Sequence, residues 1–242
     1  MNLSDQRRDE ILEATTAFYH AGLLKSPRIL TYLRGRRLSE EIMIQARLGY
    51  ASGGLREHLL ASGFGLEECQ ASAVVRADGK DFFFRKIAIP YVSHGKVMLL
   101  RARTDPEEPD KAYFPLPGYP VRLYGEDLLA TAAQVIITEG EFDCLVLRQW
   151  GLDAVAIPGA SAFKPEWVKL FGHCQRIYLD LDMDEAGRRA TSCIAPYFGE
   201  RALVVSLPQG KDVTEYACLG GTPKDYEELL AKAKSWISLE LE

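Results

Sequence analysis

Three short stretches in the second half of the chain decide the fold: QVIITEGEFDC at residues 134–144, RIYLDLDMDEAG at 176–187 and GKDVTE at 210–215. In the first two, a run of apolar and β-branched residues is followed at once by acidic residues and then by a helical pattern. Runs of this kind, separated by helices, are typical of parallel strands that are buried on both faces of a sheet. The stretches therefore predict alternating strands and helices, with acidic side chains where the strands end.

The residues around these stretches extend the same pattern. We expect strands at 135–138, 154–157, 176–181 and 202–206, and helices at 142–150, 165–171, 186–197 and 213–219. The predicted fold class is α/β, with an α+β N-terminal subdomain followed by a parallel sheet that carries helices on both faces. The expected domains are a basic N-terminal subdomain at residues 1–130, a metal-binding subdomain at 131–220 and a helical tail at 221–242.

The N-terminal half carries a different pattern. Residues 9–47 have helical periodicity, with helix starts expected at Ser26-Pro27 and at Ser39. Residues 72–104 predict strands, among them Phe82–Phe84 and a pair of strands joined by a His94-Gly95 turn. Residues 105–120 contain five prolines and predict an ordered loop.

Composition excludes several classes of protein. Of the 242 residues, 47% are hydrophobic, yet no apolar run approaches the roughly 20 residues that a membrane span needs. The five cysteines are well separated and form no CxxC pair, so we expect no zinc site made by this chain alone. An odd number of cysteines and the lack of an apolar leader predict reduced thiols, a cytoplasmic location and no membrane partner.

Charge is distributed unevenly along the chain. The net charge is -5, but residues 1–103 hold 16 Lys and Arg against 11 Asp and Glu, and residues 104–242 hold 13 against 23. Basic residues in the first half fit either a solvated helical surface or a track for a phosphate backbone. An acidic half beside a basic half suits an enzyme that holds divalent metals next to a polyanion.

Acidic side chains follow three of the expected strands. Glu139 and Asp143 come after the first strand, Asp182 and Asp184 after the third, and Asp212 after the fourth. One such group alone is explained by the preference of carboxylates for helix N-termini, but three groups at one sheet edge repel one another unless a cation lies between them. Such oxygen ligands suit Mg²⁺ or Mn²⁺, so we expect Asp143, Asp182 and Asp184 as metal ligands with Asp212 in support.

In order and spacing, these acids resemble the motifs of the TOPRIM domain, which bacterial-type primases, topoisomerases and some nucleases contain. The three stretches quoted first match the three motifs of that domain. The N-terminal half is similar to the polymerase domain of bacterial DnaG-type primases, and the similarity covers roughly residues 15–220. It is carried by YLRG at 32–35, KIAIP at 86–90, KAY at 111–113 and LYG at 123–125.

The resemblance implies a Rossmann-like TOPRIM sheet and the activity of a DNA primase. Such an enzyme is a metal-dependent nucleotidyltransferase that joins nucleoside triphosphates into short RNA primers on single-stranded DNA during DNA replication. The resemblance implies catalytic roles for Asp143, Asp182 and Asp184, and it makes Glu139 a general base or an orienting residue. It further implies basic residues that contact template and nucleotide phosphates: Arg34, Lys86, Arg103, Lys111 and Arg122.

The chain departs from the family pattern at three positions. Tyr119 stands where the family often has a lysine, with Arg122 as a substitute nearby. Thr214 stands where the family has a second acid, and Asp180 is an additional acid that we expect to lie in a strand. The zinc-binding and helicase-binding modules that accompany this domain in the family are expected to be missing. A separate zinc-binding module and a replicative helicase are therefore candidate partners of an excised core or a free-standing primase.

Two other functions stay open. A TOPRIM nuclease would use the same acids to hydrolyse phosphodiesters, although the primase-like N-terminal motifs argue against it. A non-catalytic module would bind single strands or a helicase, although the presence of all the main acids argues against that function. A topoisomerase fits less well because the chain leaves no room for the domains that carry its tyrosine nucleophile.

Overall fold

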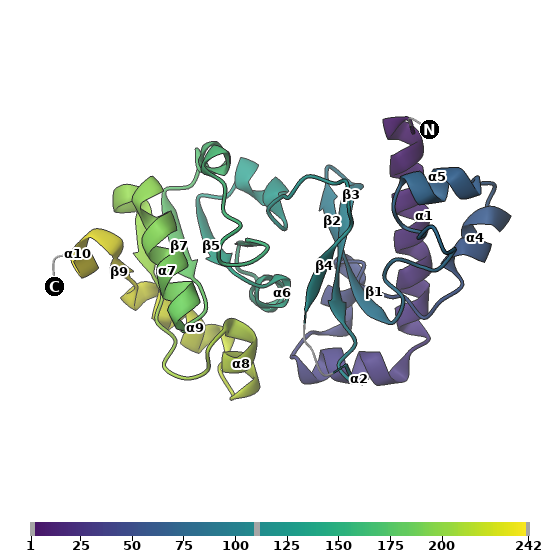
Figure 1. Cartoon of the computed structure of the whole chain (residues 1–242). Helices are drawn as coiled ribbons and strands as arrows, with labels where there is room; N and C mark the ends of the chain where they lie inside the picture. The colour runs from purple at the N-terminus through teal and green to yellow at the C-terminus, as the bar shows by residue number, and fades with distance from the viewer. Residues whose placement is uncertain (1–2, 109–111, 241–242) are drawn as a thin grey trace. The chain divides into compact units, whose positions relative to one another are not determined.

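The computed structural model describes residues 3–108 and 112–240, and the chain divides into two compact units (Figure 1). Unit 1 consists of Met1–Arg34 and Glu40–Pro120, and unit 2 of Gly35–Ser39 and Val121–Glu242. The five cysteines are free thiols, as the sequence predicts. In the part of the chain that the structure describes, no helix is both long and apolar enough to cross a membrane.

Unit 1 is an antiparallel sheet with helices packed on it. The sheet has the order β1-β2-β3-β4, formed by Gly49–Tyr50, Lys86–Ser93, Lys96–Thr104 and Tyr113–Pro115. Helix α1 (Asp5–Leu24) begins at Ser4, whose side chain accepts a hydrogen bond from the Arg7 amide. Its buried side chains, such as Ile11 and Leu12, share a core with Leu100 and Ala102 of β3. The remaining helices of this part are α2 (Pro27–Gly35), α3 (Glu40–Gln45), α4 (Leu55–Ala61) and α5 (Leu66–Ala71).

Most elements predicted for the N-terminal half are confirmed, with three exceptions. Residues 105–120, predicted to be a loop, contain the strand β4, which pairs with β3. Phe82–Phe84 form turns instead of a strand, because the chain there bends back so that Val75 and Asp81 make an isolated bridge. Pro27 starts α2 as predicted, but the Ser26 hydroxyl donates to the Gly22 carbonyl instead of capping the helix. The β2–β3 turn is confirmed, since His94 and Gly95 both have positive φ, at 49° and 76°.

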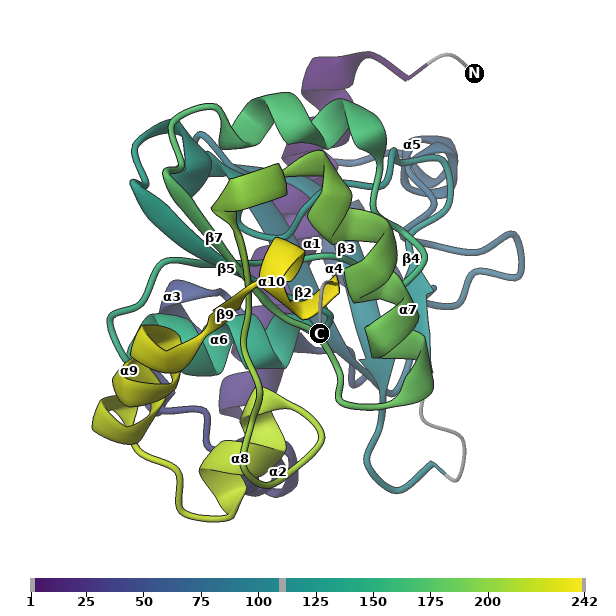
Figure 2. The same ribbon diagram turned by 90° about the vertical axis from the view of Figure 1, so that its left-hand side faces the viewer.

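Unit 2 is built on a five-stranded sheet of order β6-β5-β7-β8-β9. The strands β5 (Gln134–Thr138), β6 (Ala154–Ala156), β7 (Arg176–Asp180) and β8 (Ala202–Val204) are parallel, as predicted. The edge strand β9 (Lys234–Ser235) was not predicted; it runs antiparallel to β8 within the tail, between α9 (Pro223–Lys232) and α10 (Trp236–Glu240). Figure 2 shows this tail in yellow along the edge of the sheet.

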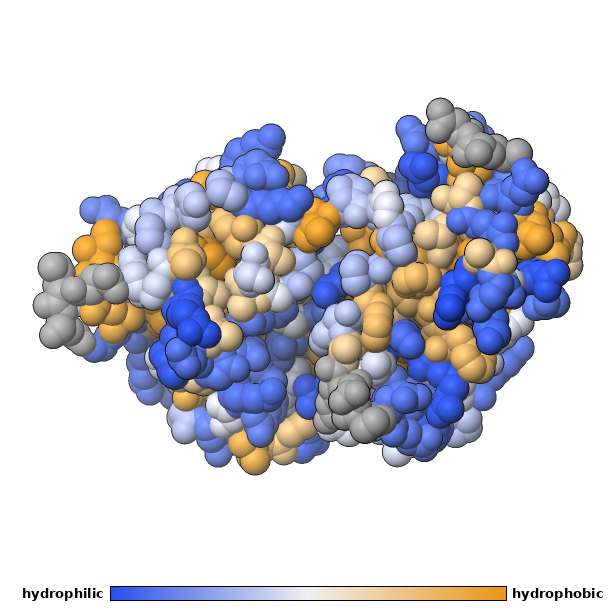
Figure 3. Space-filling model, in the orientation of Figure 1, coloured by the Kyte–Doolittle hydropathy of each residue, from blue (hydrophilic) through white to orange (hydrophobic). Residues whose placement is uncertain are grey.

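Helices cover both faces of this sheet. Alternate strand residues, such as Ile137 and Leu179, share a core with η2 (Pro165–Phe171) and α7 (Glu185–Ile194). The residues between them, including Tyr178 and Asp180, point to the opposite face, because side chains alternate along a strand. The remaining helices of the unit are η1 (Glu126–Ala130), α6 (Glu141–Gln149), η3 (Ala195–Tyr197), η4 (Gly199–Arg201) and α8 (Val213–Cys218). On the surface seen in Figure 3, hydrophilic residues predominate and hydrophobic residues form small separate areas.

Candidate functional site

The acidic residues of unit 2 gather where its parallel strands end. Thr138 at the end of β5 pairs with Asp180 at the end of β7, so the loops that follow both strands leave the sheet at the same edge. Glu139 follows β5 and Asp182 follows β7, while Asp143 lies in the first turn of α6. The loop after β8 reaches the same place, because the Met183 amide donates to the Lys211 carbonyl over 2.8 Å.

Asp143 is held at the N-terminal end of α6. Its Oδ1 accepts hydrogen bonds from the amide of Thr214 at 2.8 Å and from the Thr214 hydroxyl at 2.5 Å. The threonine that replaces the family's second acid therefore positions Asp143, a role that the sequence did not suggest. A Cβ added to Gly140 would lie 2.3 Å from Asp143 Oδ2, so glycine at that position leaves room for the carboxylate.

Asp182 and Glu139 are joined across the two strand ends. The backbone amide of Asp182 donates to Glu139 Oε1 over 3.3 Å. Close packing holds the Asp182 loop against α7, since a Cβ on Gly187 would lie only 1.9 Å from the Asp182 carbonyl oxygen. Glu139 therefore helps to position Asp182. Two roles were predicted for Glu139, and this contact fits the orienting one.

Asp184 and Asp212 each cap a helix. Asp184 Oδ1 accepts from the Gly187 amide at the start of α7, and Asp212 Oδ1 accepts from the Glu215 amide at the start of α8. Helix capping is the explanation given above for a single acid after a strand, because carboxylates are favoured at helix N-termini. It occupies one oxygen of each carboxylate.

Asp180 is the last residue of β7, as expected for an acid within the strand, and its side chain is only 4% exposed. Its Oδ2 accepts from the hydroxyl of Tyr226, a fully buried residue of α9, over 2.5 Å. Its Oδ1 is buried without a hydrogen-bond partner.

Burial and mutual repulsion dominate the electrostatics of this edge. Burial, and next the charge of Asp212, raise the pKa of Asp143 to about 7. Burial, then the charges of Glu139 and Asp212, raise the pKa of Asp182 to about 6. The pKa of Glu139 is raised by burial and by Asp184 and Asp143. These carboxyl groups lie close enough to disfavour one another's charge, which is the condition that a bound cation relieves.

The donor set fits a divalent cation in its chemistry. Carboxylate oxygens are the ligands that Mg²⁺ and Mn²⁺ prefer. The repulsion among these groups is offset in part by Lys211, which acts on Asp182 and forms a 3.9 Å ion pair with Asp212. Within residues 3–108 and 112–240, no three Asp, Glu, His or Cys side chains are already arranged around one point as metal ligands. In the described structure, Asp184 and Asp212 each use one oxygen to cap a helix, and Asp143 uses one oxygen to accept from Thr214.

The predicted basic residues that the structure describes are divided between the two units and, within unit 1, between helix α2 and the two faces of the sheet. In unit 1, Lys86 and Arg103 lie on opposite faces of the sheet, because Lys86 pairs with Thr104 and not with Arg103. The Lys86 ammonium lies 4.8 Å from the centre of the Phe114 ring, and Arg34 forms an ion pair with Glu40. In unit 2, Arg122 is ion-paired with Glu126. Lys111 lies outside the described residues.

One arginine that sequence reasoning missed lies beside Arg103. Arg101 and Arg103 are on the same face of β3, and their guanidinium groups lie 5.3 Å and 5.4 Å from the centre of the Tyr113 ring. Arg101 also donates to the Tyr91 hydroxyl, and Arg103 to the Tyr113 hydroxyl. The signal was available in the sequence, since Arg-Ala-Arg alternates with the period of a strand.

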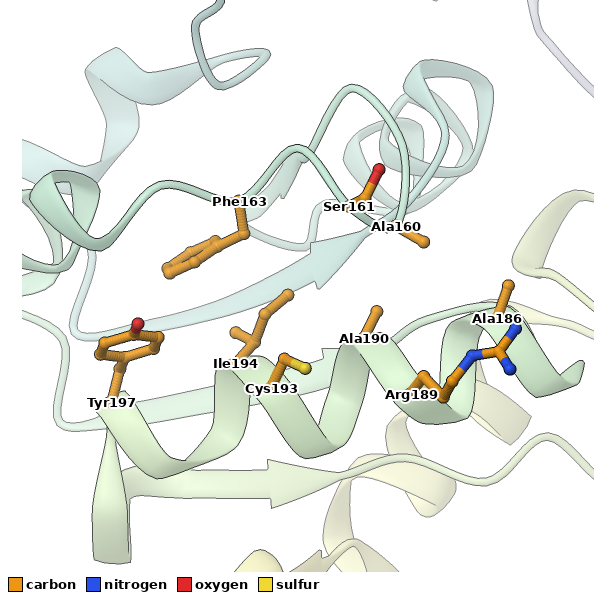
Figure 4. A pocket seen from close by; sticks show the side chains of 9 residues that line it. All are labelled: Ala160, Ser161, Phe163, Ala186, Arg189, Ala190, Cys193, Ile194 and Tyr197. Carbon is orange, nitrogen blue, oxygen red and sulfur yellow. The ribbon is translucent and has the colours of Figure 1, made fainter.

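A hollow of about 500 Å³ lies between α7 and the loop after β6 (Figure 4). In that view Phe163 and Tyr197 mark one end, and Ala186 and Arg189 the other. Its lining is mainly apolar and belongs to the η2–α7 face of the sheet, whereas Asp180 and its partner Tyr226 lie on the opposite face. Asp180 and Tyr226 therefore lie outside the hollow, whereas Ala160 in its lining also hydrogen-bonds Glu139 through its backbone.

In sequence, the chain is similar to DNA primases. A family model described as Toprim-like matches residues 136–217. The chain is 26% identical over 232 residues to a DNA primase of Aquifex aeolicus and 28% identical over 245 residues to one of Pseudomonas putida. These matches cover 88% of this chain but 46% and 36% of the relatives, so the chain spans less than half of their length. It is also 30% identical over 133 residues to the gene 57 protein of Mycobacterium phage D29, covering 52% of this chain and 86% of that protein.

Solved structures give the same result for the fold. The RNA polymerase domain of Mycobacterium tuberculosis primase DnaG matches with a TM-score of 0.83 at 24% identity, covering 96% of this chain and 85% of that one. A DnaG primase catalytic domain bound to single-stranded DNA matches with a TM-score of 0.79 at 24% identity, over 95% of this chain and 80% of that one. Matches at this level of identity establish the fold, and they confirm the α/β class predicted from the sequence.

Proposed function

This chain belongs to the family of bacterial DnaG-type primase catalytic cores, and we propose that it synthesises short RNA primers on single-stranded DNA. The observation that carries the proposal is the group of acidic side chains at the ends of β5 and β7 and after β8. The proposal assigns the primase-like chemistry to residues 131–220, the basic subdomain to 1–130 and the helical tail to 221–242.

In this proposal, Asp143, Asp182 and Asp184 are the metal ligands, with Asp212 in support. TOPRIM primases depend on a divalent metal, generally Mg²⁺, which when bound neutralises the triphosphate and promotes ionisation of the attacking 3′-hydroxyl. The chain's own contribution is positional. Thr214 orients Asp143, the Glu139 carboxylate holds the Asp182 loop, and the close contact at Gly187 keeps that loop against α7.

The proposal gives Glu139 a role beyond orientation. Its pKa is raised, chiefly by burial, so it keeps a greater affinity for a proton than an exposed glutamate. That property suits a general base that takes up the proton of the 3′-hydroxyl. Its hydrogen bond to the Asp182 amide uses Oε1 and supports the orienting role at the same time.

Basic residues of the chain are proposed to bind the phosphates of template and nucleotide: Arg34, Lys86, Arg103, Lys111 and Arg122. Arg101 joins this set, because it shares the Tyr113 ring and the sheet face with Arg103. Arginine beside exposed aromatic side chains is a usual surface for single-stranded nucleic acid. A replicative helicase and a separate zinc-binding module remain proposed partners, and the cytoplasm remains the proposed compartment.

The test compares two activities of the same preparation. The chain is incubated with single-stranded DNA, labelled nucleoside triphosphates and Mg²⁺ or Mn²⁺, and in parallel with end-labelled DNA alone. We expect short RNA products that require template and metal and that Asp182→Asn does not make. Cleavage of the labelled DNA without primer synthesis would instead support the nuclease.

A further inference from the structure

Asp180 is a buried acid that the proposed chemistry does not use. It ends β7, and a single hydrogen bond, from the Tyr226 hydroxyl to Oδ2, is its only side-chain bond in the described parts of the chain. The Tyr226 ring is fixed in turn, since its centre lies 5.8 Å from the Trp150 ring and 6.3 Å from the Tyr216 ring. One oxygen of Asp180 is therefore held firmly, and the other has no partner.

A buried carboxylate with one unpaired oxygen is costly to keep. Removing such a group from water is unfavourable unless hydrogen bonds replace those lost to solvent. If Asp180 served only to fasten α9 to the sheet through Tyr226, an uncharged acceptor would do so at a lower cost. An unpaired buried oxygen of this kind points to a partner that is not part of the chain, such as bound water or an ion.

The neighbours of Asp180 identify the kind of partner. The charges of Asp143, Asp182 and Asp212 all act on it, so it lies next to the proposed metal ligands. The largest charge effects on Asp180 thus come from other acids, and its hydrogen bond is to the neutral hydroxyl of Tyr226. A partner for Oδ1 in this place must be a donor that tolerates several carboxylates, and water bound to a divalent cation meets that description.

We propose that Asp180 is a positioning residue of the metal centre, whose Oδ1 accepts a hydrogen bond from cation-bound water while Tyr226 holds Oδ2. The inference rests on the proposed function, because it assumes that the neighbouring acids bind a divalent cation. It adds an acid that the three motifs do not contain, and it gives α9 a part in the site through Tyr226.

Mn²⁺ binding to the full chain without nucleotide tests the inference. Free Mn²⁺ is measured by electron paramagnetic resonance for wild type, Asp180→Asn and a charge-matched control, Asp153→Asn. Asp153 is exposed and precedes β6, at the end of the strands opposite to the acids. We expect Asp180→Asn to bind Mn²⁺ about 10-fold or more weakly, as loss of an outer-sphere partner typically does, and the control to bind like wild type.

Thermal unfolding without metal separates this role from a structural one. Asparagine keeps a carbonyl that can accept from Tyr226 and removes one of the repelling charges, so the metal-free variant should melt at the same or a higher temperature. A lower melting temperature together with unchanged Mn²⁺ affinity would show that Asp180 only fastens α9, and it would overturn the inference.

Tyr226→Phe supplies a second variant. Loss of the hydroxyl releases Asp180, so we expect weaker Mn²⁺ binding in the wild-type background and no further weakening in the Asp180→Asn background. An equal loss in both backgrounds would overturn the part assigned to Tyr226. If wild type itself binds no Mn²⁺, the proposed function fails; if wild type binds and Asp180→Asn binds equally well, only this inference fails.

Discussion

Buried carboxylates have opposite partners in the two units. In unit 1, Asp105 is completely buried, and it accepts from the Arg28 guanidinium at 2.5 and 2.6 Å and from the Tyr50 hydroxyl at 2.7 Å. In unit 2, Asp143 and Asp182 are surrounded mainly by other acids. Arg28 holds the pKa of Asp105 well below its usual range, whereas burial and repulsion raise the pKa of Asp143 and Asp182.

The difference in their partners distinguishes an acid that stabilises the fold from acids whose charge a bound ligand would compensate. Asp105 joins β3 to α2 and β1 through Arg28 and Tyr50, and its charge is compensated within the protein. The charges at the edge of the unit 2 sheet are compensated in part by Lys211, which pairs with Asp212 and opposes the rise in the pKa of Asp182, and the remaining repulsion is what a bound cation would relieve. Burial alone therefore does not mark a functional acid: Asp81 of unit 1 is also buried, and it accepts from the Leu55 amide. The acids of unit 2 differ in that several of them lie together and repel one another.

The largest expected effect is on catalysis. Asp182→Asn should reduce primer synthesis by more than the roughly 10–100-fold that loss of an outer-sphere partner costs, because a proposed direct ligand is removed. Without metal the variant should be as stable as wild type or more stable, because one repelling charge is gone. Primer synthesis at saturating Mg²⁺ and thermal unfolding in a chelator measure both effects.

Asp105→Asn is the matched control in unit 1. It should lose about 1–3 kcal/mol of stability, since it removes the buried charge that pairs with Arg28. Part of the loss is offset, because Arg28 is 42% exposed and still pairs with Glu107. Its primer synthesis per folded molecule should stay close to that of wild type. The contrast between Asp105 and Asp182 would be wrong if Asp182→Asn were less stable than Asp105→Asn and still made primers.

The next effect is stabilisation by the metal itself. At about 100 times its dissociation constant, Mg²⁺ should stabilise the wild-type chain by about 2.7 kcal/mol, because it binds the folded state only. Asp143→Asn should lose most of this gain, and Asp105→Asn should retain it. Denaturant unfolding with and without Mg²⁺ gives the two values, and an equal gain in Asp143→Asn would remove Asp143 from the ligand set.

The two units also differ in how much of them could be predicted from sequence. In unit 2 each strand and the acids after it are contiguous, so apolar runs and spacing predicted the sheet and the place of Glu139, Asp143 and Asp182. Thr214 and Tyr226 were missed, because their partners Asp143 and Asp180 lie 71 and 46 residues away in the chain. Tertiary contacts of this length leave no local pattern.

Unit 1 was less predictable for the same physical reason. A side chain on an antiparallel sheet takes its neighbours from other strands, so the register decides which residues meet. Sequence reasoning placed Lys86 and Arg103 in one set of phosphate-binding residues, and the register places them on opposite faces of the sheet. The alternation of Arg101 and Arg103 is visible in the sequence, but their shared contact with Tyr113 comes from the pairing of β3 with β4.

A smaller effect is expected on the binding of single-stranded DNA. Arg101→Ala and Arg103→Ala should each weaken the binding of DNA by about 1–3 kcal/mol. Each lost phosphate contact should also reduce the slope of the logarithm of the binding constant against the logarithm of the salt concentration by about 0.7 on a single strand. Mn²⁺ affinity should not change, because both arginines belong to unit 1. Fluorescence anisotropy over a salt series measures the binding. Wild-type affinity and slope in both variants would leave this face of the sheet without a role in DNA binding.

The smallest effect is a pH dependence of stability that differs between the units. A carboxyl group with a raised pKa binds more protons in the folded than in the unfolded state, so its contribution is present at low pH and is lost as the pH rises through the folded pKa. For Asp182 and Asp143 the window runs from about 4, the unfolded value, to about 6 and about 7. Asp105 has a lowered pKa, so its contribution is lost only as the pH falls below about 4.

Thermal unfolding in a chelator should therefore show wild type losing stability between pH 5 and pH 7.5. In Asp143→Asn the loss should be smaller, since one group that binds an extra proton in the folded state is gone and its neighbours are repelled less. Asp105→Asn should keep the wild-type slope over this range, because Asp105 is ionised throughout. Saturating Mg²⁺ should reduce or reverse the slope in wild type, since the cation binds the ionised acids and competes with protons. An identical slope in Asp143→Asn and wild type would mean that Asp143 does not take up a proton on folding. The contrast between the two units would then rest on the other acids of this edge whose pKa is raised, Asp182, Glu139 and Asp180.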